Sequence, residues 1–441
     1  MVRPEIVITG FGAVSGLGGT AAQFVAAVRQ GTSALTVGAV HQAQPSEGLA
    51  KLRALADGAC GLASGSSAVL ARVGDFGASA AIDAGRRRRM PRLGQMAIVA
   101  AQQALGWQAT GAGRGGAAAL DRYGADRIGI VLGTALGALD LTMEFVAQWI
   151  EHGLHTASPA TFPYTVLNTP AALIAMELGL RGPNVTVNHR DLSAFEALAT
   201  ACDLLRMGRL DAVIAGGTDE LSDALLHAYA RLGALPRQGA GPSLPYDRRR
   251  TGLNPGEGAM LFLLERADAA AARGVTPWAT VLGYGRAGAD RARVGWHAAQ
   301  GHVGAPPADS AQAVDRALNM AGCAPQTIDF VAGAGNGTAL DRLETQVLRA
   351  ALGEHAERVP IASLLWQTGD WPTSTAARVG QALVALRDQV LPGGRCDVPD
   401  PDAALPGVCR HEDARAATVN RVLLPVLAQG GGSGAIILGR A

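Results

Sequence analysis

The sequence predicts an α/β fold built from two pseudo-equivalent halves. Short apolar segments that end in glycine alternate with longer segments rich in alanine and leucine, the order typical of layered α/β proteins. The apolar segments are continuous, as expected for strands covered on both faces. The segment RIGIVLGTALGALD near residue 130 is echoed by TIDFVAGAGNGTALD near residue 335, and DAVIAGGTDE resembles QGGGSGAIILG. These repeats indicate two halves, placed at residues 1–258 and 259–441, although coincidence in a glycine-rich chain is the alternative.

The individual elements follow from the same alternation. Short apolar runs predict seven strands, at residues 6–8, 128–132, 185–187, 212–215, 260–264, 330–332 and 435–438. Longer segments rich in alanine and leucine predict seven helices, at residues 96–105, 139–150, 170–178, 193–207, 310–321, 341–352 and 375–388. Residues 37–90 form the least regular region.

The charge balance excludes several functions. The 441 residues carry 38 basic and 37 acidic side chains, a net charge of +1, which is too balanced for a protein that binds nucleic acid by neutralising phosphates. Lys51 is the only lysine among the basic residues. Because it follows Ala50 rather than a glycine, it does not complete a P-loop, and a Schiff-base enzyme would have no other lysine to use.

The cysteines and the apolar segments indicate the compartment. The five cysteines are scattered without a C-x-x-C pair or a histidine cluster, so the sequence predicts neither a zinc site nor disulfides. The start of the chain carries Arg3 and Glu5 and lacks an export signal, and no apolar stretch is long enough to span a membrane. We therefore expect a soluble cytoplasmic protein with no membrane partner.

Two motifs favour structural explanations. The segment Gly10-Phe-Gly12-Ala-Val-Ser-Gly16-Leu-Gly18 has the wrong spacing for a dinucleotide loop, and no acidic residue follows before Glu47 to bind a ribose. We expect structural turn glycines there. The run Arg86 to Arg89 is expected to be a solvated surface, with a patch for an anionic partner as the alternative.

The most informative segment runs from Ser158 to Glu220. It predicts a helix, a turn at Gly182-Pro183, a strand, a sharp turn around Asp191, a second helix, and a strand that ends in two glycines. Such a strand-turn-helix elbow often presents a catalytic nucleophile at a helix N-terminus. Asp191 suits a helix cap, and no ordinary nucleophile occupies the turn.

Several long ordered segments resemble one family. They are IVITGFGAVSGLG, GTALGALD, LGLRGPNVTV, GRLDAVIAGGTDE, PYDRRRTGLNPGEGAMLFLLE, ALVALRDQVLP and GGGSGAIIL. Through them the chain resembles, almost from end to end, the β-ketoacyl-acyl carrier protein synthases of the thiolase-like superfamily. The resemblance implies a thiolase-like, five-layered αβαβα fold.

The resemblance also implies where catalytic residues would lie. Active members use a cysteine at the elbow, two histidines and a lysine, but here Asp191 takes the cysteine position, Gly333 the first histidine, Leu365 the lysine and Asp370 the second histidine. A carboxylate is a poor acyl acceptor and cannot replace an imidazole that donates to an enolate. We therefore expect no condensing chemistry. Cys202 is expected to be a small core residue, and His189 to serve packing.

A synthase-like chain without this machinery resembles a chain-length factor of type II polyketide synthases. The resemblance implies a heterodimer with an active ketosynthase, a growing polyketide chain, and substrates carried on the phosphopantetheine of an acyl carrier protein, with no cofactor bound to this chain. Gly430 stands where synthases carry a gating phenylalanine.

The same resemblance implies tunnel residues at Leu139, Thr142 and Val146, three and four residues apart on one helix face. None is aromatic, which favours a longer, narrower channel and an extended polyene product, as does the segment SPATFPYTVLNTPAA. The alternative is that the three residues simply pack a helix.

Two other functions stay open. In one, Asp191, Asp370 and His189 line an acyl-thioester pocket for acid/base chemistry such as isomerisation or hydrolysis. In the other, the chain is a homodimeric acyl-binding protein with no role in polyketide assembly.

Overall fold

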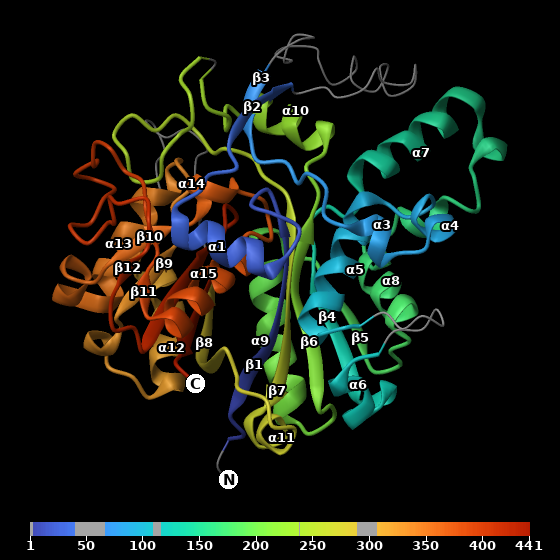
Figure 1. Cartoon of the computed structure of the whole chain (residues 1–441). Coiled ribbons are helices and arrows are strands. Elements are labelled where there is room, and N and C mark those ends of the chain that lie inside the picture. Colours follow the sequence, from blue (N-terminus) through green and yellow to red (C-terminus); the bar gives the residue numbers. More distant parts are fainter. Residues whose placement is uncertain (1–2, 40–66, 109–115, 238, 289–306) are drawn as a thin grey trace.

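The computed structural model describes residues 3–39, 67–108, 116–237, 239–288 and 307–441. Its centre is a ten-stranded mixed sheet (Figure 1). From one edge to the other the strands are β10 (Ile361–Ser363), β9 (Phe330–Gly333), β13 (Arg421–Leu427), β14 (Gly432–Gly439), β8 (Ala279–Gly288), β1 (Ile6–Ser15), β7 (Gly258–Arg266), β6 (Ala212–Asp219), β4 (Ile128–Gly133) and β5 (Asn184–Val187). Two short pairs lie apart from it, β2 (Thr36–Ala39) with β3 (Ser67–Leu70) and β11 (Val390–Leu391) with β12 (Arg415–Ala416).

The two halves of the sheet share one pairing pattern. Along β1-β7-β6-β4-β5 the pairs are antiparallel, antiparallel, parallel and parallel. Along β8-β14-β13-β9-β10 the pattern is the same. The halves join where β1 pairs antiparallel with β8 over three residues, Ile6 to Ile8. The predicted duplication is therefore confirmed, and β4 and β9, the first repeated pair, hold corresponding places.

The second predicted repeat is wrong. DAVIAGGTDE forms β6, whose counterpart in the other half is β13, whereas GGGSGAIILG forms β14, the counterpart of β7. Glycines beside an apolar strand occur wherever a strand is closely covered, so the similarity reflects local packing. The predicted boundary between residues 258 and 259 stays a prediction. It falls at the start of β7, a strand that pairs with β1 and β6 of the first half.

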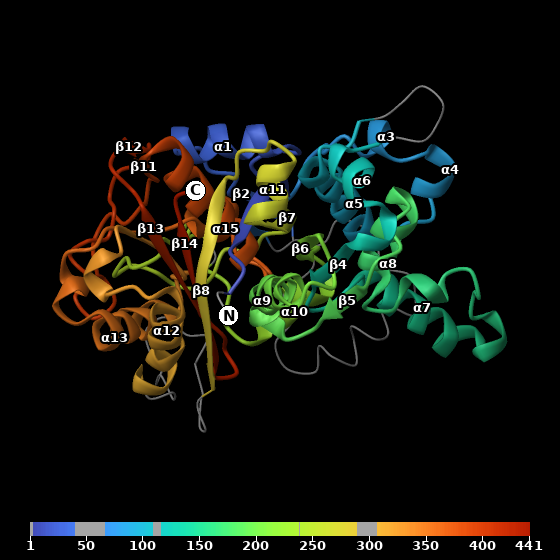
Figure 2. The same ribbon diagram turned by 90° about the horizontal axis from the view of Figure 1, so that it is seen from below.

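Helices complete five layers, which Figure 2 shows from below. α9 (Ser193–Arg206) and α15 (Thr375–Asp388) contact each other and strands of both halves, so they form the central layer. α5 (Arg92–Leu105) and α8 (Thr169–Leu178) cover one half from outside, and α12 (Pro307–Ala321) and α13 (Leu340–Leu352) cover the other. The thiolase-like αβαβα fold is confirmed. The other helices are α1 (Ala21–Gln30), α3 (Ala78–Ala81), α4 (Ala84–Arg87), α6 (Ala118–Tyr123), α7 (Leu139–His152), α10 (Asp223–Arg231), α11 (Ala267–Ala272) and α14 (Leu365–Thr368).

Close packing of helices on strands explains the first glycine motif. Gly10 and Gly12 lie inside β1, not in a turn as expected, and a Cβ on either would lie 1.8 or 1.9 Å from a backbone oxygen of α5. Gly283 and Gly285 of β8 take the same place beneath α12, at 2.4 and 2.1 Å. Each half therefore needs glycine where an outer helix touches its first strand.

All seven predicted strands and all seven predicted helices are present. Three strands of the ten-stranded sheet were missed: glycines interrupt β8, Pro425 lies within β13, and β10 has only three residues. Arg86, Arg88 and Arg89 are exposed, and Arg86 pairs with Glu177 (2.9 Å). Lys51 and Cys60 lie outside the described residues. Within the described ranges no helix combines the length and hydropathy needed to cross a membrane.

Candidate functional site

The predicted elbow forms between β5 and α9. A 3-10 turn, Arg190–Leu192, joins them. Arg190 has a φ of 47°, a left-handed conformation that is uncommon for a side chain of this size. Asp191 follows Arg190, and its Oδ2 accepts a hydrogen bond from the backbone amide of Gln429 (3.2 Å). The constrained turn holds residue 191 against the loop that precedes β14.

Asp191 lines an internal cavity of about 40 Å³, which we call the elbow cavity. Leu365 and Asp370 line it too, so three of the four positions compared with catalytic residues come together, while Gly333 is represented only by its neighbour Ala334. Substrate pockets are usually about 300–1,000 Å³, so the elbow cavity has room for only ~3 water molecules. Its other lining residues are Tyr229, Leu253, Asn336, Leu340, Trp371, Pro372, Ser374, Thr375, Arg378, Val426, Leu427 and Gln429.

Two carboxyl groups face this cavity, and each has a raised pKa. Burial, followed by the charge of Asp370, raises the pKa of Asp191 to about 6, against the opposing effects of the Gln429 amide and Arg190. A group of this kind carries a proton for part of the time near neutral pH. It is not a strong acyl acceptor.

Asp370 is more firmly held than Asp191. Its Oδ2 accepts from Asn336 Nδ2 (2.8 Å) and its Oδ1 from Ser374 Oγ (2.7 Å). Burial has the largest effect and raises the pKa of Asp370. The hydrogen bonds from these two donors and the charge of Arg378 oppose this increase without cancelling it. Both carboxylate oxygens therefore accept hydrogen bonds from neighbouring side chains.

The space beside Gly333 is filled. A Cβ on Gly333 would lie 2.2 Å from Tyr246 Oη. That hydroxyl donates to Glu344 Oε2 (2.7 Å) and accepts from Gly335 N (3.2 Å). The position compared with the first histidine consequently has no room for a side chain unless Tyr246 moves.

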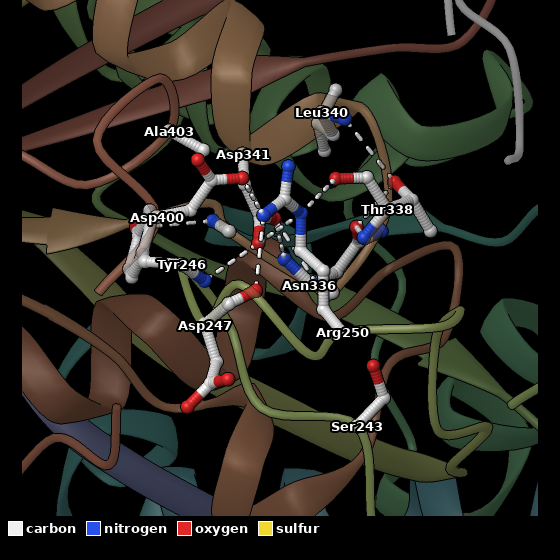
Figure 3. A network of polar contacts seen from close by, with 12 residues as sticks. Ser243, Tyr246, Asp247, Arg250, Asn336, Thr338, Leu340, Asp341, Asp400 and Ala403 are labelled. Carbon is white, nitrogen blue, oxygen red and sulfur yellow. Dashed lines mark hydrogen bonds and ion pairs between the residues drawn. The ribbon is translucent and has the colours of Figure 1, made fainter. Parts of the chain in front are cut away.

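A buried polar network holds the loop that follows β9 (Figure 3). Arg250 lies between two carboxylates. Its Nε is 3.7 Å from Asp341 Oδ2, and its Nη1 donates a hydrogen bond to Asp400 Oδ2. Asp341 in turn accepts from the backbone amides of Tyr246 (2.6 Å) and Asn336 (2.7 Å). The network joins the segment before β7 to the loop before α13, and it reaches the elbow cavity through the side chain of Asn336.

The remaining predicted residues are placed as follows. Leu365 is buried at the start of α14 and offers the cavity only an apolar side chain. His189 is exposed and does not line the elbow cavity. Cys202 is buried in α9, where burial raises its pKa to about 12, so its role as a core residue is confirmed. Gly430 is exposed, and nothing lies within 4 Å of a Cβ placed on it.

The three predicted tunnel residues lie on α7, which Figure 1 shows projecting to the right of the sheet. Leu139 packs on an apolar cluster that includes Tyr229 and Leu253, both of which line the elbow cavity. Thr142 uses its hydroxyl to donate to Ala138 O (2.9 Å). Val146 is half-buried in the described chain. Their role as tunnel residues stays a prediction.

Asp219 is a buried residue at the site that sequence patterns did not identify. Its carboxylate accepts from Thr134 Oγ1 (3.0 Å), Ala135 N (2.8 Å) and Thr373 N (3.1 Å). Burial raises its pKa to about 6, against the opposing effect of these donors. The only signal in the sequence is an acidic residue that ends a buried strand.

A five-layered thiolase-like fold, with an elbow that faces an internal cavity, defines the class of the condensing enzymes. Residues 3–270 match the N-terminal domain of the β-ketoacyl synthases, and residues 279–394 match the C-terminal domain. The chain therefore belongs to the β-ketoacyl synthase family.

Individual relatives agree with this membership. A 3-oxoacyl-[acyl-carrier-protein] synthase 2 from Synechocystis sp. is 26% identical over 413 residues, 91% of this chain and 90% of that protein. A Streptomyces virginiae protein named as a polyketide β-ketoacyl synthase is 32% identical over 365 residues, 80% of this chain and 82% of that protein. The solved structure of the ishigamide ketosynthase/chain length factor matches with a TM-score of 0.82 at 24% identity, covering 100% of both chains.

Proposed function

We propose that the chain is a non-catalytic chain-length factor, which forms a heterodimer with an active ketosynthase and shapes its tunnel in type II polyketide assembly. One observation carries the proposal: Tyr246 fills the space beside Gly333, the position that the resemblance assigns to the first histidine. Asp191, which the resemblance assigns to the place of the elbow nucleophile, lines the cavity nearby. A site that lost its residues but kept its space could regain chemistry through another residue. A filled site supports a subunit whose function lies elsewhere.

The chemistry of the elbow cavity supports the same proposal. Condensation needs a nucleophile and hydrogen-bond donors aimed at an enolate oxygen. Leu365 offers no donor, and both oxygens of Asp370 accept bonds from neighbouring side chains. The cavity is also far smaller than an acyl chain requires.

The surface of the chain supports a protein partner. β5 pairs only with β4 in the described part of the chain, so its outer edge is open. Large apolar side chains on and after α7 are exposed, among them Trp149, Ile150, Leu154 and Phe162. Open strand edges and clustered apolar side chains mark contact surfaces. We assign this surface to the ketosynthase subunit, by strand-to-strand pairing at β5.

The substrate in this proposal is a growing polyketide carried on the phosphopantetheine of an acyl carrier protein, engaged mainly through the partner. Leu139, Thr142 and Val146 limit the chain end, and their lack of an aromatic ring favours an extended polyene. The name of the Streptomyces relative supports polyketide assembly.

The proposal is tested with the purified chain and with a candidate partner, a ketosynthase that carries the catalytic cysteine and both histidines. Alone, the chain is expected neither to become acylated, by intact-mass spectrometry, nor to decarboxylate malonyl-carrier protein. Co-expression is expected to yield a heterodimer that elongates. Condensing activity of the chain alone, or a ketosynthase that is equally soluble and active without it, would contradict the proposal.

Two carboxyl groups with raised pKa values in one cavity favour a second candidate, an enzyme that uses Asp191 and Asp370 for acid/base chemistry on acyl thioesters. Asp191→Asn and Asp370→Asn separate the two. Unchanged product from the complex removes support for the enzyme, and loss of product with an intact heterodimer supports it. Failure to copurify with any cysteine-containing homologue would instead favour a homodimeric acyl-binding protein.

A further inference from the structure

Asp219 joins three segments that are far apart in the sequence. It is the last residue of β6 and is 2% exposed. Its Oδ1 accepts from Thr134 Oγ1 (3.0 Å) and Ala135 N (2.8 Å), in the turn between β4 and α7. Its Oδ2 accepts from Thr373 N (3.1 Å), between α14 and α15. One buried carboxylate therefore ties the start of α7 both to the sheet and to the segment at the elbow cavity.

The turn before α7 is also held from its other side. Asn188, which follows β5, donates from Nδ2 to Thr134 O (3.1 Å) and Ala135 O (2.7 Å). Asp219 thus binds the donors of the turn while Asn188 binds its acceptors. The turn is therefore held by side chains at the ends of β6 and β5, the two strands that flank β4.

α7 is only partly covered by the rest of this chain. Ala147 is the only buried residue among its 14 positions. Its main contacts are with α10 and with the turns that follow it, and Leu139 packs on the apolar cluster that includes Tyr229 and Leu253. Because most of the helix is only partly buried, the hydrogen bonds of the turn that starts it help to set its direction.

The second anchor of Asp219, Thr373, lies beside the elbow cavity. Thr373 lies between Pro372 and Ser374, which both line that cavity, and Ser374 also holds Asp370. The segment around Asp370, the position compared with the second histidine of active relatives, therefore also holds the turn before α7 through Asp219.

We propose that Asp219 is a positioning residue for product length, which fixes α7 and so the places of Leu139, Thr142 and Val146 relative to the chain end. The inference rests on the proposed function, because product length depends on α7 only if this chain shapes the tunnel. It adds a residue that touches neither substrate nor tunnel and acts through the turn at Thr134.

The test uses the complex with the ketosynthase, acyl carrier protein and malonyl-carrier protein, with product lengths measured by mass spectrometry. Asp219→Asn replaces one accepting oxygen with a donor of the same shape. We expect the ratio of off-length to main product to rise about tenfold, the size of one lost charge-assisted hydrogen bond, while heterodimer yield and total product stay within about twofold.

A matched pair of variants at residue 134 separates positioning from general weakening. Thr134→Val keeps the shape and removes the donor, so we expect a broader length distribution. Thr134→Ser keeps the donor and is expected to give wild-type lengths. Equal distributions for the two variants would overturn the inference, as would a lower total product with unchanged lengths. The pair also decides the question should Asp219→Asn not fold.

Val146→Phe separates failure of this inference from failure of the proposed function. If it changes product length while Asp219→Asn and Thr134→Val do not, the proposed function stands and the positioning role is overturned. If no variant changes length, the tunnel role of the α7 positions and the positioning role of Asp219 both fall, while the heterodimer test still decides the proposed function. Hydrogen exchange on the isolated chain adds a readout: the amides of Ala135 and Thr373 are expected to exchange faster in Asp219→Asn, and unchanged exchange overturns the role.

Discussion

The hydroxyl of Tyr246 occupies the space that a side chain on Gly333 would need. A Cβ at residue 333 would lie 2.2 Å from Tyr246 Oη, and this hydroxyl is fixed by its bond to Glu344 (2.7 Å). Tyr246 is itself buried, with a φ of 63°. The closure therefore involves backbone, side chain and a buried carboxylate together.

Gly333→Ala is expected to lower the free energy of unfolding by about 1–3 kcal/mol, because the added methyl group overpacks a site that cannot relax. Gly430→Ala, where nothing lies within 4 Å of the Cβ, is the control and is expected to change it by less than about 0.5 kcal/mol. In a Tyr246→Phe background the cost of Gly333→Ala should shrink, since the closest atom is gone. Equal costs for both glycines in urea unfolding would contradict this packing.

Asp191→Asn is expected to stabilise the fold at pH 8. The pKa of Asp191 is raised from its ordinary 3.8 to about 6, so the fold favours the protonated form. Its contribution to stability is complete below pH 3.8 and is lost as the pH rises through 6. The asparagine side chain does not ionise, so the variant avoids this loss, which amounts to at most about 3 kcal/mol in the free energy of unfolding.

Urea unfolding between pH 4 and pH 8 measures the effect of Asp191→Asn. The gain over wild type should appear at pH 8 and fade toward pH 4. Because Asp219 also has a pKa raised to about 6, the variant keeps part of the wild-type pH dependence. The exposed Asp121→Asn is the control. A gain that is constant with pH would argue against ionisation as its cause.

Val146→Phe is expected to shorten the main product of the complex, because a bulky ring would narrow the tunnel at α7, while the heterodimer still forms. Gln148→Phe places the same ring on an exposed position of the same helix and serves as the control. Mass spectrometry of the products provides the measurement. If both variants shorten the product, or neither does, these positions do not line the tunnel.

Phe162→Ser and Ile150→Ser are each expected to raise the Kd of the heterodimer about tenfold, since exposed side chains of this size bury apolar area in a complex. They are 56% and 60% exposed in the isolated chain. Val398→Ser, in the segment between β11 and β12, is the control. Figure 1 shows β11 and β12 on the opposite side of the molecule from α7. Sedimentation velocity measures all three, and an unchanged Kd for Phe162→Ser and Ile150→Ser would place the partner elsewhere.

Much of the fold was predictable from the order of its segments. Strands and helices with uninterrupted apolar runs were found, because burial on both faces leaves a plain pattern in the sequence. β8 and β13 were missed because glycines under α12 and Pro425 interrupt that pattern. The second repeat was misassigned for a related reason, since glycines mark close packing in any strand.

The candidate site was also predictable from the sequence only in part. Motif spacing led to Asp191, Leu365 and Asp370, which share the elbow cavity. Asp219 was missed because its partners lie 84 and 154 residues away in the chain, beyond any local pattern.

The sequence by itself determined which residue types stand at the positions compared with the catalytic ones, because the identity of a residue decides whether it can be a nucleophile or a donor. It also determined the layered α/β class, because that class depends on the order of apolar segments. Only the tertiary structure decided that the place of the first histidine is filled by Tyr246 and that Asp219 holds the start of α7. Filled space and buried hydrogen bonds depend on atoms brought together from distant segments, so local sequence carries little sign of them.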